Sequence, residues 1–130
     1  MIHGIGVDVV LTRRISSVLQ RHGDRFARRV LCEAEWTDFE GAPDRGAFLA
    51  KRFAAKEAFG KALGTGVRVP ATLHAVWVVR NALGKPALRF DDALAGWMAA
   101  RGIHRHHLSL SDERGVAVAM VVLETAEVQP

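Results

Sequence analysis

The sequence predicts an α+β fold in which a largely antiparallel sheet packs on a long central helix and on shorter helices. Runs rich in β-branched residues lie near both ends of the chain, and residues 47–66 form a long stretch dominated by Ala, Lys and Leu. The predicted order is one strand, several helices, two strands, a helix and two strands, which lacks the regular alternation of a parallel sheet. The 130 residues, 49% hydrophobic and 25% charged, predict a single domain over residues 1–130.

The first half of the chain is predicted to hold one strand followed by helices. The segment IHGIGVDVV, rich in Ile and Val, predicts a strand at about residues 2–9. Thr12 is expected to cap the next helix, RRISSVLQRHG, which Gly23 ends. The segments DRFARRVL and EAEWTDFE predict further helical pieces before the break at residues 41–43.

The second half begins with the strongest helix signal, AFLAKRFAAKEAFGKALGTG, which Gly64 closes. The segment TLHAVWVVR predicts a strand, and LGKPAL predicts a turn into another strand. Either Asp91 or Asp92 is expected to cap the helix ALAGWMAARG, which Gly102 ends. The tail predicts a hairpin made of the strand HLSLS, the turn DERG and the strand VAVAMVVLE.

Charge and cysteine content limit the classes of function that fit this sequence, but they do not select one of them. The net charge of +4, from 18 Lys and Arg against 14 Asp and Glu, fits an acidic protein partner, a phosphorylated ligand or nucleic acid. Cys32 is the only cysteine, so no intrachain disulfide can form. No apolar run reaches transmembrane length and no secretory leader is recognisable, so a cytoplasmic protein with no membrane role is expected.

Charged side chains line part of the predicted central helix. Arg52 and Lys56 are four residues apart and share a face, and Glu57 and Lys61 repeat this spacing in the order that favours an ion pair. Gly60, inside the helix, is expected where another backbone or a ligand comes close. One interpretation is a solvated helix face with an exposed Glu–Lys pair. The other is a binding site for phosphate groups.

Asp8 is the one charged residue in the apolar segment GIGVDVV. An ionised carboxylate is very costly to bury without a partner. Three interpretations are open: a salt bridge with an arginine, a strand face exposed to water, or a ligand of Mg²⁺. Mg²⁺ binds one or two protein carboxylates, and phosphates and waters complete its coordination. Asp8 and Glu57 would supply these carboxylates, and Lys61, one helical turn beyond Glu57, would face the same phosphates.

Four segments, in order along the chain, resemble the holo-[acyl-carrier-protein] synthases, the small members of the 4′-phosphopantetheinyl transferase superfamily. These segments are GIGVDVV, RFAAKEAFGKALGTG, GKP and HLSLSDERGVAVAMVVLE, so the resemblance covers nearly the whole chain. It implies the 4′-phosphopantetheinyl transferase fold and transfer of the 4′-phosphopantetheine group of coenzyme A to a serine of an acyl carrier protein. It also implies release of adenosine 3′,5′-bisphosphate, a requirement for Mg²⁺, and a homotrimer with coenzyme A sites at subunit interfaces.

The resemblance assigns roles to individual residues. Asp8 and Glu57 occupy the metal-ligand positions and Lys61 matches the lysine near the pyrophosphate, so these three are the expected catalytic residues. The proton acceptor for the carrier serine stays open between Glu57 and a water molecule. The residues expected to bind coenzyme A are Arg45, Arg52, Phe53, Lys56, Gly60, Lys61, Gly64, Thr65, Lys85, Pro86 and His107.

Two positions near the end of the chain stand apart from this pattern. Many relatives have His after the SLS segment, where this chain has Asp112, and no role is assigned to Asp112. The segment HRHH holds three histidines, of which only His107 matches a family position. A His-X-His pair without a third ligand is a weak sign of a transition-metal site.

Acyl carrier proteins are strongly acidic, so the family also predicts a basic docking surface. The arginines expected to form it lie along the first helical region and are Arg14, Arg21, Arg25 and Arg29. The alternative is a basic face that serves solubility alone. The carrier itself stays open among those of fatty-acid, polyketide and peptide synthesis.

Three other functions remain as alternatives. A nucleic-acid-binding module would use the basic helices, although the sequence lacks interleaved aromatic and basic residues or zinc-ligand spacing. A structural subunit would keep the fold and lose the activity, which the presence of Asp8, Glu57 and Lys61 argues against. A different coenzyme A-dependent transferase would need no Mg²⁺ and would leave coenzyme A whole.

Overall fold

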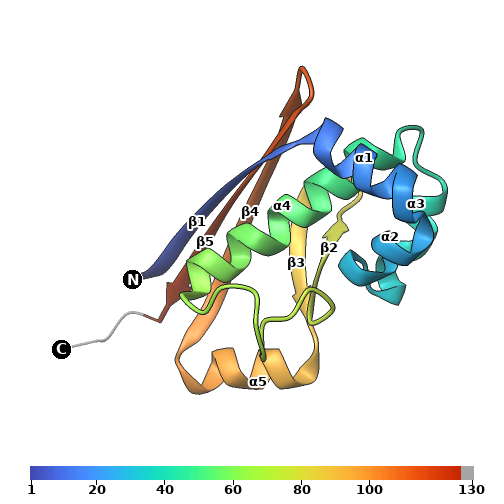
Figure 1. Cartoon of the computed structure of the whole chain (residues 1–130). Helices are drawn as coiled ribbons and strands as arrows, with labels where there is room; N and C mark the ends of the chain where they lie inside the picture. Colours follow the sequence, from blue (N-terminus) through green and yellow to red (C-terminus); the bar gives the residue numbers. More distant parts are fainter. Residues whose placement is uncertain (127–130) are drawn as a thin grey trace.

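A computed structural model describes residues 1–126, and its helices and strands follow the predicted order (Figure 1). The elements are β1 (Ile2–Leu11), α1 (Thr12–His22), α2 (Asp24–Val30), the 3-10 helix η1 (Glu33–Glu35), α3 (Trp36–Glu40), α4 (Arg45–Leu63), β2 (Val76–Arg80), β3 (Pro86–Phe90), α5 (Asp92–Ala100), β4 (Ile103–Glu113) and β5 (Val116–Thr125). The strands form an antiparallel three-stranded sheet, ordered β1-β5-β4, and an antiparallel pair, β2-β3. The predicted α+β class is confirmed.

The long helix α4 lies along one face of the three-stranded sheet, and α1, α2 and α3 surround its first turns (Figure 1). Asp44 caps it, because its Oδ1 accepts a hydrogen bond from Ala47 N at 3.0 Å. Gly64 ends it in the left-handed conformation, with φ of 91°, as the sequence predicts. Ala58 and Phe59 belong to the main core, to which β2, β3, α5, β4 and β5 also contribute buried side chains.

Two glycines bring β1 against the backbone of α4. A Cβ at Gly4 would overlap the carbonyl oxygen of Ala62, and a Cβ at Gly6 would overlap that of Ala58. Side chains alternate between the two faces of a strand, so Asp8 lies on the same face as these glycines, towards α4. The spacing of GIGVD therefore does two things: it lets the strand touch the helix, and it places a carboxylate beside that helix.

The opposite face of the sheet is apolar along β1 and β5 and exposed to solvent. Val7 pairs with Met120 in the register of β1 and β5, and these side chains are 46% and 42% exposed. Their neighbours Ile5 and Val9 are 53% and 60% exposed. An apolar sheet face of this kind, uncovered in the single chain, marks an interaction surface.

Three local predictions need correction. Thr12 is the first residue of α1 and does not cap it; the N-cap is Leu11, because β1 runs into the helix and Thr12 N still bonds Gly115 O at 2.9 Å. Residues 72–75 form a turn, and the strand begins at Val76. The hairpin turn is shorter than DERG: β4 continues to Glu113, and the turn residues Arg114 and Gly115 both have positive φ, as tight hairpins require.

The helix α5 is capped by Asp91, whose Oδ1 accepts from Leu94 N at 2.8 Å, which decides between the two aspartates proposed from the sequence. Among residues 1–126, the structure contains no helix with the length and apolar character needed to cross a membrane.

Candidate active site

Asp8 of β1 meets Lys61 of α4 at the surface of the protein. Lys61 Nζ donates to Asp8 Oδ1 at 3.2 Å and to the carbonyl oxygen of Val7 at 2.9 Å. The side chain of Asp8 is 17% exposed and that of Lys61 is 54% exposed. The sequence left three interpretations of Asp8 open. In the single chain Asp8 forms an ion pair that is partly open to water, and its partner is a lysine, where the sequence suggested an arginine.

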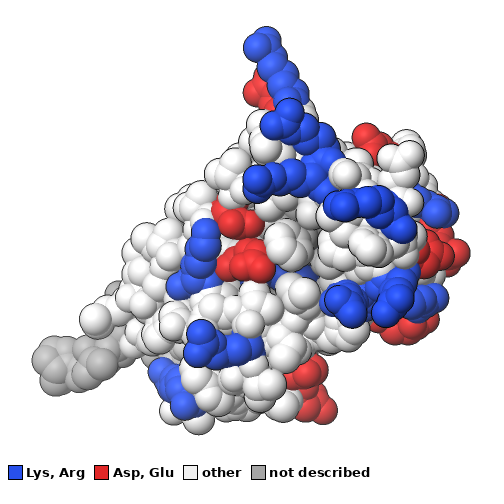
Figure 2. Space-filling view, in the orientation of Figure 1, with Lys and Arg blue, Asp and Glu red and all other residues white. Residues whose placement is uncertain are grey.

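Glu57 completes a cluster of two carboxylates and one ammonium group. Burial raises the pKa of Glu57, the negative charge of Asp8 raises it further, and Lys61 opposes both effects. Figure 2 shows acidic side chains over the middle of α4, bordered by basic ones. Two carboxylates that repel each other beside a single ammonium group favour the binding of a further cation.

The donor set at this cluster fits Mg²⁺. Residues 1–126 contain no group of three or more His, Cys, Asp or Glu side chains arranged to hold a metal ion, so the protein donors here are the oxygens of Asp8 and Glu57. Mg²⁺ takes oxygen ligands, commonly one or two carboxylates, and keeps positions for waters and substrate phosphates. A structural zinc site, by contrast, needs four protein ligands.

Arg52 and Lys56 do not lie on the solvated face that the helical spacing suggests. They are buried, 4% and 1% exposed, and both are paired with the buried carboxylate of Glu35. Burial lowers the pKa of both basic groups, and the charge of Glu35 opposes this effect. Both cations therefore belong to the interior of the folded chain, and their contacts with coenzyme A stay a prediction.

Glu35 is the residue that sequence reasoning misses. It lies in EAEWTDFE, where nothing local marks it as buried, and its partner Lys56 is 21 positions away in the sequence. Its Oε1 accepts from Lys56 Nζ at 2.6 Å, and its Oε2 accepts from Val78 N at 3.4 Å. Only the packing of η1 against α4 and β2 reveals this carboxylate as the counter-charge of two cations.

The last turn of α4 carries Lys61, and the expected coenzyme A-binding residues Gly60, Gly64 and Thr65 lie next to it in the sequence. A Cβ at Gly60 would lie 2.8 Å from the carbonyl carbon of Gly66, whose N–H donates to Gly60 O at 3.0 Å. The close approach predicted at Gly60 is therefore made by the chain's own backbone. Gly64 N bonds Lys61 O at 3.2 Å, and Thr65 follows it at the surface with its hydroxyl donating to Gly66 O at 2.8 Å.

Other residues expected to bind coenzyme A are spread over the molecule. Arg45 begins α4 and donates to Glu40 O at 3.1 Å, and the helical rise puts it roughly 24 Å from Lys61. Phe53 is half-buried and packs against the smaller core beneath α1 and α2. Lys85 and Pro86 lie at the turn into β3.

His107 lies on the other face of the three-stranded sheet from Asp8. It pairs with Val122 in β5, whereas Asp8 pairs with Ala119, whose side chain is buried against α4. His107 Nε2 lies 2.7 Å from Glu124 Oε2 at the surface, and this bond is the main reason that the pKa of Glu124 is lowered. Because the sheet separates Asp8 from His107, a single chain does not bring the whole expected set around one ligand.

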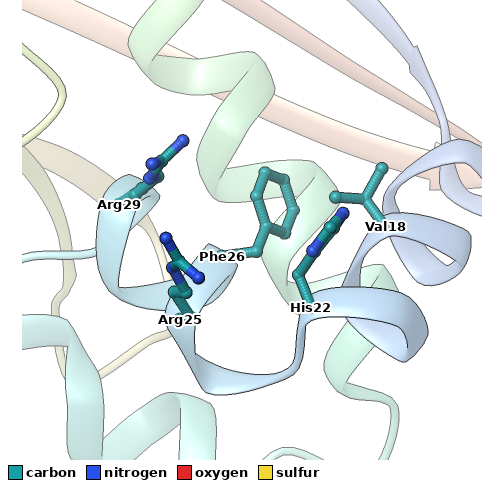
Figure 3. Close-up of a pocket in the computed structure, with 5 residues that line it drawn as sticks. All are labelled: Val18, His22, Arg25, Phe26 and Arg29. Atoms are coloured by element: carbon teal, nitrogen blue, oxygen red, sulfur yellow. The ribbon is translucent and has the colours of Figure 1, made fainter.

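The four arginines expected to dock a carrier are exposed on two adjacent helices, Arg14 and Arg21 on α1, and Arg25 and Arg29 on α2. Two hollows lie between them. One, of about 380 Å³, is lined by Val18, His22, Arg25, Phe26 and Arg29 (Figure 3). The other, of about 520 Å³, is lined by Arg13, Arg14, Ser17, Val18 and Arg21. The basic surface therefore has an apolar floor, which the arginine spacing alone does not reveal.

Comparison with known proteins decides the family. Residues 4–121 match the model of the 4′-phosphopantetheinyl transferase superfamily. The chain belongs to this superfamily. Within it, the holo-[acyl-carrier-protein] synthase of Azoarcus sp. (strain BH72) is 57% identical over 125 residues, which cover 96% of this chain and 99% of the relative. That of Aromatoleum aromaticum is 55% identical over 124 residues, covering 95% and 98%.

This phosphopantetheinyl transferase also shares its fold with solved structures. The holo-[acyl-carrier-protein] synthase of Neisseria meningitidis superposes with a TM-score of 0.93 at 43% identity, covering 96% of this chain and 100% of that one. The synthase of Bacillus anthracis, solved in complex with CoA (3′,5′-ADP), gives 0.82 at 37% identity, covering 97% and 99%. The family and fold implied by the sequence resemblance are confirmed.

Proposed function

We propose that this transferase moves the 4′-phosphopantetheine group of coenzyme A onto a serine of an apo acyl carrier protein and releases adenosine 3′,5′-bisphosphate. The observation that carries the proposal is the cluster of Asp8, Glu57 and Lys61, which the contact of β1 with α4 builds from residues far apart in sequence. Support also comes from the names of the relatives, and from the coenzyme A complex of the Helicobacter pylori synthase, which is 27% identical.

The residues of the cluster have separate tasks. Asp8 and Glu57 would hold Mg²⁺, which supplies charge neutralisation at the diphosphate of coenzyme A. The serine Oγ bonds to the β-phosphorus, the bond from that phosphorus to the bridging oxygen breaks, and the bisphosphate leaves with this oxygen. The carboxylate of Glu57 accepts the proton of the serine. The ammonium group of Lys61, more than half exposed, stabilises the charge that develops on the leaving bisphosphate.

Intact-mass spectrometry tests this function directly. Apo carrier proteins of fatty-acid, polyketide and peptide synthesis are incubated with the protein, coenzyme A and Mg²⁺. A gain of one phosphopantetheine on a carrier, abolished by a chelator, is expected. The absence of a gain on every acidic carrier would contradict the proposal, and acylation that leaves coenzyme A whole would point to a different transferase. Binding to DNA that fades with salt would point to a nucleic-acid module.

The basic surface of α1 and α2 is proposed to dock the acidic carrier. Exposed arginines rim a floor that includes Val18 and Phe26 (Figure 3), so the surface suits an acidic segment that also presents an apolar side chain. Charges at the rim of an interface mainly steer association and are screened by salt. The docking proposal therefore predicts a salt-sensitive affinity for the carrier that is independent of coenzyme A.

Reversing the charge at Arg14 is expected to raise KM for the carrier about tenfold at low salt, and less at high salt. The affinity for coenzyme A, measured by calorimetry, should stay unchanged. Arg101→Glu, directly after the end of α5, makes the same change in net charge away from this surface and should leave KM for the carrier within about twofold. An equal effect of both substitutions would show that overall charge, and no defined surface, attracts the carrier.

We also propose that the chain forms a homotrimer with coenzyme A sites between subunits. The apolar face around Val7 and Met120 is exposed to solvent in the single chain. Burying it against a second copy of the chain is the simplest way to remove it from water. His107 lies on this outward side of the sheet, beside the apolar strip, so association would carry it towards another subunit. A ligand bound between two copies would then contact Asp8 of one subunit and His107 of another, which lie on opposite faces of the sheet in a single chain.

Val7→Glu is expected to convert the trimer into monomers, because it places a charge in the middle of the apolar strip. Light scattering coupled to size exclusion should report the change in mass. Arg89→Glu, which is also exposed and on a strand, serves as the control for an added charge. A wild-type chain that is monomeric at micromolar concentration would overturn the proposed assembly.

A further inference from the structure

The ammonium group of Lys56 joins three separate segments of the chain. Its Nζ donates to Glu35 Oε1 at 2.6 Å, to the carbonyl oxygen of Val30 at 2.7 Å and to that of Leu73 at 2.6 Å. An ammonium group has three N–H bonds, so all of them end on this chain. These three hydrogen bonds fix the positions of the segments relative to α4.

One of the three segments is the end of α2, the helix that carries Arg25 and Arg29. The last carbonyl groups of a helix have no partner within it. Val30 O accepts from Lys56, and Arg28 O lies 2.6 Å from His74 Nε2. The basic helix is therefore held at its end by two side chains, of which the buried one comes from α4.

Lys56 is also connected to the proposed reaction centre through the helix on which it lies. It directly precedes Glu57 on α4, so the same helical turn carries the anchor of α2 and a carboxylate of the proposed reaction centre. On the far side of this turn, the glycines of β1 contact Ala58 and Ala62. The three hydrogen bonds of Lys56 hold one side of this turn, and the contact with β1 holds the other side. Together they fix the rotation of α4 about its own axis.

We propose that Lys56 is a positioning residue, which holds the carrier-docking helix α2 at a fixed place relative to Glu57 so that the carrier serine meets the diphosphate. This inference rests on the proposed function and gives Lys56 a role through its hydrogen bonds within the chain. Glu35 is the counter-charge that allows an ammonium group to occupy the interior, because both side chains are fully buried.

Lys56→Met tests the inference, because methionine keeps most of the length and loses all three hydrogen bonds. The variant should fold, since Arg52 Nη1 remains 3.6 Å from Glu35 Oε2 and no carboxylate is left unpaired. Misplacement of reacting groups by about 1 Å can cost a hundredfold in rate. We expect kcat for carrier modification to fall at least tenfold, while Kd for coenzyme A, from calorimetry, stays within about twofold.

Hydrogen exchange separates positioning from plain stability. Amides of residues 24–31 should exchange faster in Lys56→Met, and those of β1 and β5 should not. Lys51→Met is the matched control: it removes a cation from the same helix, one whose partner is Asp112 at 3.8 Å, and leaves α2 untouched. It should change neither kcat nor the exchange of residues 24–31.

His74→Ala gives a second approach if Lys56→Met folds poorly. The imidazole is exposed and holds the same end of α2 through Arg28 O, so its loss should lower kcat about threefold in a protein of nearly unchanged melting temperature. Normal kcat in a variant whose α2 exchanges faster would overturn the inference. The wild-type protein, assayed alongside, must modify the carrier; its failure to do so would instead reject the proposed function.

Discussion

Glu57→Gln is expected to lower the turnover of carrier modification about a thousandfold. The substitution removes one of the two carboxylates proposed to hold Mg²⁺ and the proposed acceptor of the serine proton, and losses of single groups of these kinds cost on the order of a hundredfold to a thousandfold or more. Intact-mass time courses with saturating coenzyme A and carrier measure the loss directly. Calorimetry should show weaker binding of Mg²⁺, with the carrier affinity retained.

The fold should survive this change, which makes the loss specific. Burial and Asp8 raise the pKa of Glu57, so the folded chain holds this proton more tightly than the unfolded chain. Stability contributed by this group therefore falls as pH rises through the normal glutamate range to the raised pKa, and the glutamine variant escapes that fall. In chelator at neutral pH its melting temperature should equal or exceed that of the wild type, and the difference should vanish in acid. A variant that melts earlier in chelator, or keeps full turnover, would contradict the assignment.

Gly6→Ala is expected to be the most damaging of the methyl-sized changes. The added Cβ would overlap the carbonyl oxygen of Ala58 and lie 2.8 Å from Ala62 N, and both are backbone atoms of α4 that cannot turn aside. Overpacking of this kind costs about 3 kcal/mol, measured as a lower midpoint of urea unfolding. Any folded fraction should also turn over slowly, because β1 must move away from α4 and take Asp8 with it.

Gly96→Ala provides the control for this prediction. Gly96 lies within α5 and a Cβ there meets nothing within 4 Å. Replacing a glycine inside a helix with alanine usually stabilises a protein by about 0.5–1 kcal/mol. Opposite signs are therefore expected for the same chemical change at the two glycines. Equal and small effects would mean that the contact between β1 and α4 is looser than the structure describes.

Much of the fold could be predicted because its signals are local. The long helix ends at Gly64, where a left-handed residue is needed, and its start is set by Asp44, one residue type that caps helices well. The last strand, β5, follows from its run of β-branched residues. The errors fall where neighbours from elsewhere decide: Thr12 looks like a cap, and it loses that role because β1 leads directly into α1.

The residues of the proposed reaction centre could also be selected from the sequence, for a different reason. Asp8 is conspicuous as a charge in an apolar strand, and Glu57 and Lys61 share one helical face through their spacing. Spacing on a helix, however, shows which side chains share a face, and it does not show whether that face is exposed to solvent or buried. Arg52 and Lys56 share their own spacing and are buried against Glu35, a residue from a short 3-10 helix.

By itself, the sequence determined the family, the order of the elements and the three groups proposed for catalysis, because these depend on local composition and on short motifs. The tertiary structure alone decided which cations are interior, that backbone from residues 66 and 67 fills the space at Gly60, and that the sheet lies between His107 and Asp8. The physical reason is that burial and pairing of charge depend on segments that approach from far along the chain. Lys56 shows this most clearly, since a lysine on a helix looks like a solvated charge until its three hydrogen-bond acceptors, from three other segments, surround it.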